Sequence, residues 1–330
     1  MEQHYYAAMH INEDICRKSS SGGAFTAITD AWFAAYPSKS VVYGCAMDEQ
    51  LRAKHIRATN QQQRDQMRGS KYIGSDMSGV MRLVEQDLKN DLYVLFSGTP
   101  CQIAGLKSFL NVKGVECGSR LLTLEVICHG VGSVRFFEDY IQSFEKRYKS
   151  KVVRCNFRGK CRPGKRQQMV LGFANGKTYE SPSIRYDGFY SAYLRNFILR
   201  PSCYVCPYAR QEREADISIA DDWRAVSEQT SRSLVIANSE AGWKWADTSL
   251  MYMRYEEIAA EQVFQPNMHH PCEKPADYDS FWSEYHRSGY SGTQKILGND
   301  DIKSNLKKVA IHFVYHFRIL DTLKLLTKRK

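Results

Sequence analysis

Two cysteines follow short apolar runs that predict buried strands. Leu92–Ser97 leads into Gly98-Thr99-Pro100-Cys101, and Leu121–Ile127 leads directly into Cys128. In an open α/β sheet the carboxyl ends of parallel strands meet at one edge, and ligands bind there. The two thiols can therefore converge from distant parts of the chain. Taken singly, each is equally compatible with a buried structural cysteine in a tight turn.

A C-x2-C turn, Cys203 to Cys206, lies between Pro201 and Pro207. This spacing lets two sulfurs bind one metal or close a redox disulfide. The prolines disfavour the helix start of a thioredoxin-like motif, and a proline after a ligand cysteine is typical of iron–sulfur sites. Together with the strand-end pair, the turn supplies the four thiolates that a 4Fe–4S cluster needs. A zinc-stabilised binding module is an alternative, although the chain has no second C-x2-C.

The remaining cysteines lack such placement, and we expect them to be structural: Cys16, Cys45, Cys117, Cys155, Cys161 and Cys272.

Three polar segments could bind anions. Ser19–Gly23 precedes a predicted helix from Ala24, where a phosphate can rest on the helix N-terminus. The loop Arg68–Asp76 could hold another part of a nucleotide, and Asn156–Lys160 adds positive charge. The plainer alternatives are an ordinary helix cap and solvated loops. Neither a P-loop nor a G-x-G-x-x-G fingerprint follows a strand.

Polar residues at two further strand ends are candidates for catalysis. His129 could tune a metal centre or shuttle a proton, and it is equally compatible with a structural histidine. Asp221 and Asp222 follow the apolar run Ala215–Ala220 and could bind a ribose hydroxyl or position a substrate. They could also simply cap the next turn.

The apolar runs alternate with helical patterns, which predicts an α/β fold with a mainly parallel sheet. A fourth run, Ser40–Ala46, completes the strands, and helices are predicted over Ala24–Tyr36, Val80–Leu88, Gln102–Leu110 and Val134–Tyr148. Over residues 152–180 the pattern changes to an antiparallel insertion, with Asn175-Gly176 as its hairpin turn.

In this order, the motifs SSSGGAFTAI, VVYGCAMD, GSKYIGSD, FSGTPCQIAGLKSFL, LEVICHGVGS, FRGK, SCYVCPYA and ADISIADDW closely resemble the coenzyme F420 hydrogenase/dehydrogenase beta-subunit family. Its known members are iron–sulfur flavoproteins that hold FAD beside a 4Fe–4S cluster. They include archaeal deazaflavin-oxidising subunits and a plant enzyme that reduces hydroxymethyl chlorophyll. Bacterial relatives occur in surface-polysaccharide loci beside pyruvyl transferases.

The resemblance implies a function for most of the motif residues. The cluster ligands would be Cys101, Cys128, Cys203 and Cys206. The FAD site would be lined by Ser19, Ser20, Ser21, Gly22, Gly23, Gly44, Lys71, Tyr72, Ser75, Arg158 and Lys160.

We therefore expect an FAD- and 4Fe–4S-dependent oxidoreductase, acting on a sugar or glycan intermediate in bacterial polysaccharide synthesis beside pyruvyl or glycosyl transferases. The alternative is a non-catalytic scaffold or electron-relay subunit of such a complex. Many members carry an N-terminal ferredoxin module, but this sequence contains no C-x2-C-x2-C run. An external ferredoxin or cluster-bearing subunit is thus the expected electron partner.

The 330 residues carry a net charge of +10, and residues 303–330 contribute eight Lys/Arg against one acid. Because the body is nearly neutral, the charge distribution argues against a nucleic-acid binder with a broad basic face, and no nucleic-acid partner is expected. The apolar stripe within Asn305–Lys330 predicts a basic amphipathic helix that packs on the body or attaches to a membrane or partner. We expect a flavin and cluster region over residues 1–300, this tail over 301–330, and a cytoplasmic protein that could touch the inner membrane face.

Overall fold

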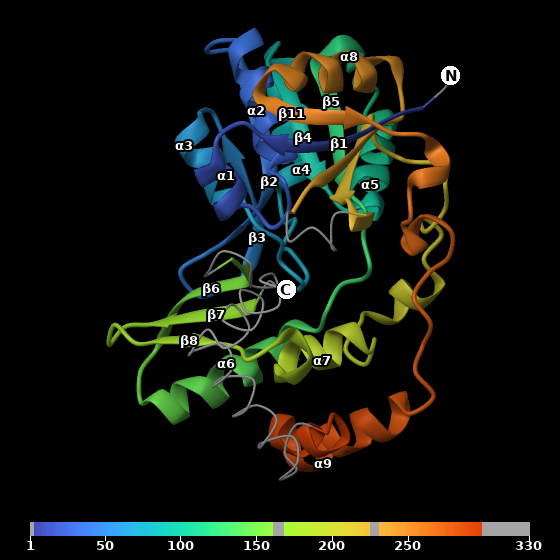
Figure 1. Ribbon diagram of the computed structural model, residues 1–330. Helices are drawn as coiled ribbons and strands as arrows, with labels where there is room; N and C mark the ends of the chain where they lie inside the picture. The colour runs from blue at the N-terminus through green and yellow to red at the C-terminus, as the bar shows by residue number, and fades with distance from the viewer. Residues whose placement is uncertain (1–2, 161–167, 225–230, 299–330) are drawn as a thin grey trace, which may run out of the picture.

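The computed structural model describes residues 3–160, 168–224 and 231–298 (Figure 1). Its strands are β1 (His4–His10), β2 (Ser40–Met47), β3 (Ala53–Ala58), β4 (Tyr93–Gly98), β5 (Leu121–Val126), β6 (Val152–Gly159), β7 (Gln168–Phe173), β8 (Thr178–Glu180), β9 (Ile217–Asp221), β10 (Ser233–Ala237) and β11 (Met253–Glu257). Its helices are α1 (Glu13–Lys18), α2 (Ala24–Ala35), α3 (Gln61–Arg64), α4 (Val80–Lys89), α5 (Pro100–Val112), α6 (Val134–Tyr148), α7 (Gly188–Leu194), α8 (Glu240–Ser249) and α9 (Tyr278–Ile296).

The larger sheet has eight strands in the order β11-β1-β10-β9-β5-β4-β2-β3. Its central strands β9, β5, β4 and β2 are parallel. Antiparallel strands extend the sheet on both sides. The carboxyl ends of the parallel strands consequently form a single edge.

Helices cover both faces of this sheet. Along β4, Val94 and Phe96 pack with α4 and α5, whereas Leu95 faces the opposite side with α2 and α8. A strand whose successive side chains are all buried reads as an unbroken apolar run. This double burial explains why the four central strands stand out in the sequence.

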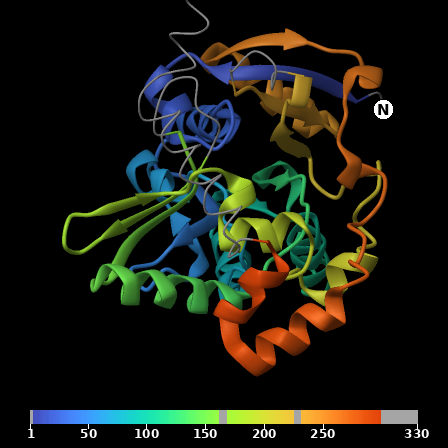
Figure 2. The ribbon, with the colours of Figure 1, turned by 60° about the horizontal axis from the view of Figure 1, so that its bottom comes forward.

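A second body lies below the sheet in Figure 1 and combines the antiparallel strands β6-β7-β8 with α6, α7 and α9. Figure 2, turned to bring this body forward, shows α6 in green beneath the small sheet and α9 in orange-red beside it. Its core is aromatic and includes six phenylalanines that are almost fully buried: Phe136, Phe137, Phe157, Phe189, Phe197 and Phe281. The predicted insertion is therefore part of a substantial second core.

One carboxylate anchors α7 within this core. Asp187 is fully buried, and its Oδ1 accepts the backbone N–H groups of Phe189 (3.1 Å) and Tyr190 (3.0 Å). Its Oδ2 accepts the Tyr140 hydroxyl at 2.8 Å. Burial raises the pKa of the Asp187 carboxyl to about 6. Asp187 thus serves as the N-cap of α7 and fixes where the aromatic residues of that helix lie.

The predicted α/β class, with parallel central strands and an antiparallel insertion, is confirmed. The four apolar runs and the four helical patterns all form the expected elements, and Gly176, with φ of +80°, lies in the turn between β7 and β8. Strands β1, β3, β10 and β11, which pair antiparallel in the larger sheet, were not predicted. The predicted tail helix lies outside the described residues. None of the helices in the described ranges is long and apolar enough to cross a bilayer.

Candidate cofactor site

Cys101 lies in the first turn of α5, directly after β4. The Thr99 N–H donates to Gln102 Oε1 at 2.9 Å, and this bond helps to begin the helix at the end of the strand. The Cys101 side chain is exposed, and its Sγ lies 3.2 Å from Thr99 Oγ1. The strand and the helix start together present this thiol at the carboxyl edge.

Cys128 follows the next strand, β5. The Ile127 N–H donates to Ile219 O in β9 at 2.9 Å, which holds the strand end in the sheet. Burial raises the pKa of the Cys128 thiol, and the neighbouring thiols of Cys203 and Cys101 raise it further. These thiols therefore lie within electrostatic reach of one another, as the sequence predicted for the two strand ends.

The C-x2-C turn is attached to the segment that follows Cys128. Cys203 N–H donates to Arg200 O, and Arg200 N–H donates to Val131 O, both at 2.8 Å. Burial raises the pKa of the Cys203 thiol, and the thiols of Cys206 and Cys101 act in the same direction. The backbone thus gathers all four predicted cysteines into one group, which we call the thiol cluster.

The thiol cluster supplies four cysteines, the number of thiolates that a 4Fe–4S cluster takes. No three His, Cys, Asp or Glu side chains in the described ranges stand close enough to hold one metal ion. A 4Fe–4S cluster takes one thiolate on each of four irons, so its cysteines are spaced more widely than the ligands of one ion. No disulfide joins the cysteines in the described part of the chain. The donor set is thus compatible with a cluster.

A fifth thiol adjoins this group, and sequence reasoning assigned it a structural role. Cys272 Sγ donates to His129 O at 2.7 Å and lies 3.3 Å from His129 Nδ1. On the other side of the ring, His129 Nε2 lies 2.8 Å from Asn196 Oδ1. Because Asn196 Nδ2 donates to Glu273 O, Oδ1 is the acceptor, and His129 carries its proton on Nε2. Burial lowers the pKa of His129, which favours the neutral ring.

The predicted phosphate turn lies at the same edge, against β1 and β10. Gly22 N–H donates to Ser233 Oγ at 2.9 Å, and a Cβ on Gly22 would lie only 2.3 Å from Ala8 O. Gly23 is the N-cap of α2, with φ of +94°, and has no side chain to cap the helix. The positive end of the α2 dipole is therefore directed toward this turn. Ser19 is buried, and its hydroxyl donates to Ile15 O.

The loop Arg68–Asp76 joins this turn to the thiol cluster. Ser70 N–H donates to Ser20 Oγ, and Gln102 Nε2 donates to Ser75 Oγ, both at 2.8 Å. Gln102 is the residue after Cys101. The loop thus contacts the phosphate turn at one end and the start of α5 at the other.

Lys71 holds this loop against β2. Its Nζ donates to three carbonyl oxygens, those of Cys45 (2.8 Å), Met67 (2.7 Å) and Arg68 (3.1 Å). A Cβ on Gly44 would lie 2.8 Å from Met67 Sδ, so glycine permits this close approach. Burial lowers the pKa of Lys71 to about 8. Because all three donors are used, Lys71 can act on an anion only through its charge.

Lys160 reaches the phosphate turn from the second body. Its Nζ donates to Cys16 O (2.9 Å) and Ser21 O (2.7 Å), which leaves one donor for a ligand. Burial, with the Arg158 charge nearby, lowers the pKa of Lys160 to about 8. In the described residues no carboxylate forms an ion pair with Lys71 or Lys160. We call the phosphate turn and these two lysines the cation cradle.

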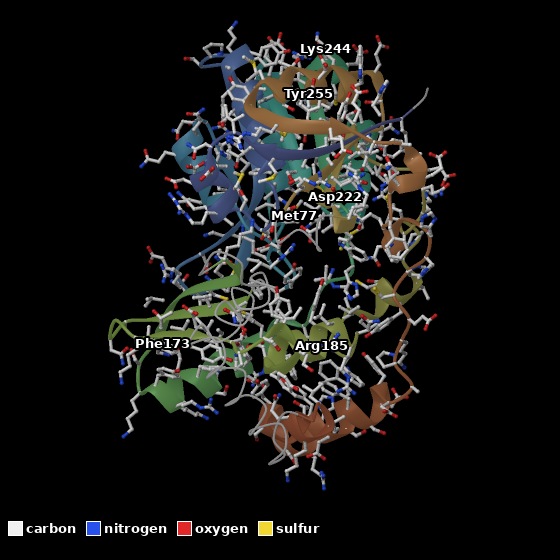
Figure 3. All side chains as sticks on the ribbon, viewed as in Figure 1. Met77, Phe173, Arg185, Asp222, Lys244 and Tyr255 are labelled. Atoms are coloured by element: carbon white, nitrogen blue, oxygen red, sulfur yellow. The ribbon has the colours of Figure 1, made fainter. Side chains whose placement is uncertain are left out.

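The candidate catalytic carboxylates are held in ion pairs. Asp221 lies 2.7 Å from Arg158, so the pair joins the end of β9 to the end of β6. Asp222 pairs with Arg224 and Arg232, both at 3.0 Å. Figure 3 shows Asp222 on the side of the large sheet turned toward the second body. Both carboxylates thus lie in ion pairs that join structural elements.

A cavity of about 770 Å³ lies elsewhere, beside β1 and the chain that follows the C-x2-C turn. Tyr5, Gln211 and Glu257 are among its lining residues, and none of the predicted site residues lines it. The candidate site is therefore the carboxyl edge where the two bodies meet.

The fold and the gathered thiols define the class of protein. The structure is similar, with a TM-score of 0.53, to a chain in a structure described as "Xenon derivatization of the F420-reducing [NiFe] hydrogenase complex from Methanosarcina barkeri". The match covers 88% of this chain and 90% of that chain at 17% sequence identity, a level that shows a shared fold. That relative is one chain of a hydrogenase complex. No curated protein sequence matches.

Residues 92–262 match the family model that describes the C terminus of the coenzyme F420 hydrogenase/dehydrogenase beta subunit. The chain belongs to the coenzyme F420 hydrogenase/dehydrogenase beta-subunit family. The resemblance predicted from the motifs is confirmed, and the general chemistry of the family is oxidation–reduction.

Proposed function

We propose that this chain is a redox subunit that holds FAD at the cation cradle and a 4Fe–4S cluster at the thiol cluster. The observation that carries the proposal is the meeting, at one sheet edge, of four thiols with two half-buried ammonium groups that form no ion pair among the described residues. When bound, FAD exchanges a hydride with a small substrate, and a 4Fe–4S cluster accepts or donates single electrons.

The cation cradle supports a phosphate-bearing ligand. Burying an ammonium without a counter-charge destabilises the protein, and a bound dianion would compensate Lys71 and Lys160 together. The N-terminus of α2, whose N-cap Gly23 has no capping side chain, favours the same anion, because backbone N–H groups and the helix dipole both attract negative charge. In this proposal Lys160 donates its remaining N–H to the ligand, and Lys71 contributes charge and the position of the loop.

The ion pairs at the edge give the two bodies a fixed separation. Arg158 and Asp221 hold β6 against β9, and Lys160 ties the same strand end to Ser21. His129 Nε2 donates to Asn196 Oδ1, and Cys272 Sγ, whose proton goes to His129 O, lies 3.3 Å from Nδ1, so these contacts orient the loop after Cys128. In this proposal the residues of this chain bind and orient the two cofactors.

The wider setting is also a proposal. Electrons would pass to or from an external ferredoxin or cluster-bearing subunit, and the substrate would be a small molecule such as a sugar or glycan intermediate of bacterial polysaccharide synthesis. Support for a partner comes from the structural relative, which is part of a complex.

The test is anaerobic purification of the full chain, with iron, sulfide and flavin measured per chain. We expect about four irons per chain, together with FAD. Cys203→Ser should lose most of the iron and keep the flavin, whereas Cys117→Ser, which alters a half-buried thiol outside the thiol cluster, should lose neither. Zinc without iron or flavin would overturn the proposal. Both cofactors present but inert toward external reductants would favour the scaffold alternative.

A further inference from the structure

Tyr193, near the end of α7, lies against the thiol cluster. Its ring is almost fully buried, and its hydroxyl donates to Gly130 O at 2.9 Å, two residues after Cys128. The ring centroid lies 5.2 Å from that of His129. Tyr193 also interacts electrostatically with the thiols of Cys128 and Cys203. One side of this tyrosine therefore belongs to the surroundings of the candidate cluster ligands.

Tyr193 also contacts Tyr72, which lies in the same loop as Lys71 of the cation cradle. The two tyrosine rings lie 4.8 Å apart at an angle of 41°. Tyr72 follows Lys71 in the chain, and its phenol interacts electrostatically with Arg158. We call the loop Arg68–Asp76 the cradle loop and residues 128–132 the Cys128 loop. The Tyr72–Tyr193 pair therefore spans from the cradle loop to the Cys128 loop.

The backbone beside this pair is packed without spare room. Gly132 N–H donates to Tyr72 O at 3.0 Å. A Cβ on Gly132 would lie 2.5 Å from Tyr72 O and 3.4 Å from Tyr193 Cδ2. Glycine is thus what lets the chain after Cys128 pass between the cradle loop and α7. A contact this close fixes the two loops relative to each other.

We propose that Tyr193 is a positioning residue that sets how closely the two cofactor sites communicate. Its ring fills the space between the cradle loop and the Cys128 loop, and its hydroxyl holds Gly130 in place. The proposal rests on the proposed function for its electronic consequence. The mechanical part, a loop held by one side chain, stands on the hydrogen bond and the ring contact alone.

The experiment compares Tyr193→Phe and Tyr193→Leu with the parent chain, as anaerobic full-length protein. Three quantities are measured: iron and flavin per chain, the magnetic interaction between the cofactors in half-reduced protein by electron paramagnetic resonance, and amide hydrogen exchange over residues 128–132. We expect both variants to keep their cofactors. Loss of the hydroxyl bond in Tyr193→Phe should speed loop exchange about fivefold, while the retained ring should preserve the magnetic interaction. Tyr193→Leu should weaken that interaction as well.

The matched control is Tyr285→Phe, which removes a hydroxyl bonded to Asp139 in the same aromatic core. It should change neither the loop exchange nor the magnetic interaction. The inference is overturned if Tyr193→Leu keeps parental loop exchange and parental magnetic interaction. If Tyr193→Leu does not fold, the test rests on Tyr193→Phe. Amide exchange at the parental rate over residues 128–132 in that variant would overturn the inference. A parent chain without iron or flavin would defeat the proposed function, and the exchange measurement would still decide whether Tyr193 holds the loop.

Discussion

The affinity of the cation cradle for FAD should fall as the pH rises above 8. Lys71 and Lys160 both have pKa values lowered to about 8, mainly by burial. A lysine with this pKa is about 90% protonated at pH 7 and about 10% protonated at pH 9. A bound pyrophosphate keeps both lysines charged, so FAD binding must take up protons at the higher pH. The dissociation constant should then rise about tenfold per lysine, or about a hundredfold for both.

Other titrating groups near the lysines act weakly in this range. Lys71 faces Cys45, and Lys160 faces Cys16, Arg158 and Asp221. Burial raises the pKa of the Cys45 and Cys16 thiols, which favours their neutral form. The pH dependence should therefore belong to the two lysines.

In the FAD-free protein, Lys71 and Lys160 should oppose the loss of stability at alkaline pH. Between pH 8 and pH 10 an unfolded chain keeps protons on these lysines that the folded chain has released. The free energy of unfolding rises with pH wherever the unfolded state binds more protons. The two lysines should thus partly offset the opposite contribution of the buried thiols, whose raised pKa values keep protons on the folded chain that the unfolded chain releases.

Calorimetric titration of the deflavinated chain with FAD, from pH 7 to pH 9 in two buffers of different ionisation enthalpy, measures affinity and proton uptake together. Lys160→Gln should remove about a tenfold share of the pH effect, whereas Lys244→Gln, an exposed lysine on α8 labelled in Figure 3, should remove none. Two results would refute the reasoning. One is a dissociation constant that does not change between pH 7 and pH 9, and the other is a pH effect that Lys160→Gln and Lys244→Gln reduce by the same factor.

Three other substitutions test separate parts of the structure. Gly22→Ala forces a Cβ against Ala8 O and should lower the free energy of unfolding by about 1–3 kcal/mol, measured in urea; an unchanged midpoint would contradict the tight packing of the phosphate turn. Cys272→Ala should keep the parental iron content because this thiol bonds to His129, so a loss of iron would make Cys272 a ligand. Asp187→Ala removes the N-cap of α7 and should cost about 2–3 kcal/mol, again from urea unfolding; no loss would mean that the aromatic core alone positions α7.

The sequence predicted that Cys101 and Cys128 can converge, because each follows a strand of the predicted parallel sheet. Apolar runs without alternation indicate strands buried on both faces, such strands are usually parallel, and parallel strands end at one edge. The structure brings both thiols together with the C-x2-C turn for that reason. A resemblance carried by eight ordered motifs led to the same residues independently.

The contacts made by loops could not be derived in this way. Cys272 meets His129 across 143 positions, and Lys160 meets Ser21 across 139. Hydrophobic periodicity reports which side chains are buried, and it carries no information on which loops come together. The ion pair of Asp221 with Arg158 is of the same kind. A strand-end carboxylate looks identical in sequence whether it meets a substrate or an arginine.

The outer strands were missed for a different reason. β3 and β11 lie at the two edges of the large sheet, and all residues of β11 after Met253 are exposed. An edge strand held by one neighbour needs little apolar surface, and charged residues there discourage pairing with other chains. Its sequence therefore resembles a polar loop.

The position of β1 has a consequence for biosynthesis. β1 pairs with β10 and β11, so the pairing of His4 with Ala237 cannot form until Ala237 has been synthesised. At about 5–20 residues per second, the roughly 230 residues between them take about 10–50 s to synthesise. The thiols of the C-x2-C turn also leave the ribosome late in this interval. A ribosome-bound chain thus lacks both a closed sheet and a full set of thiols until it is well over half made. We expect the nascent chain to need protection of β1 during that time.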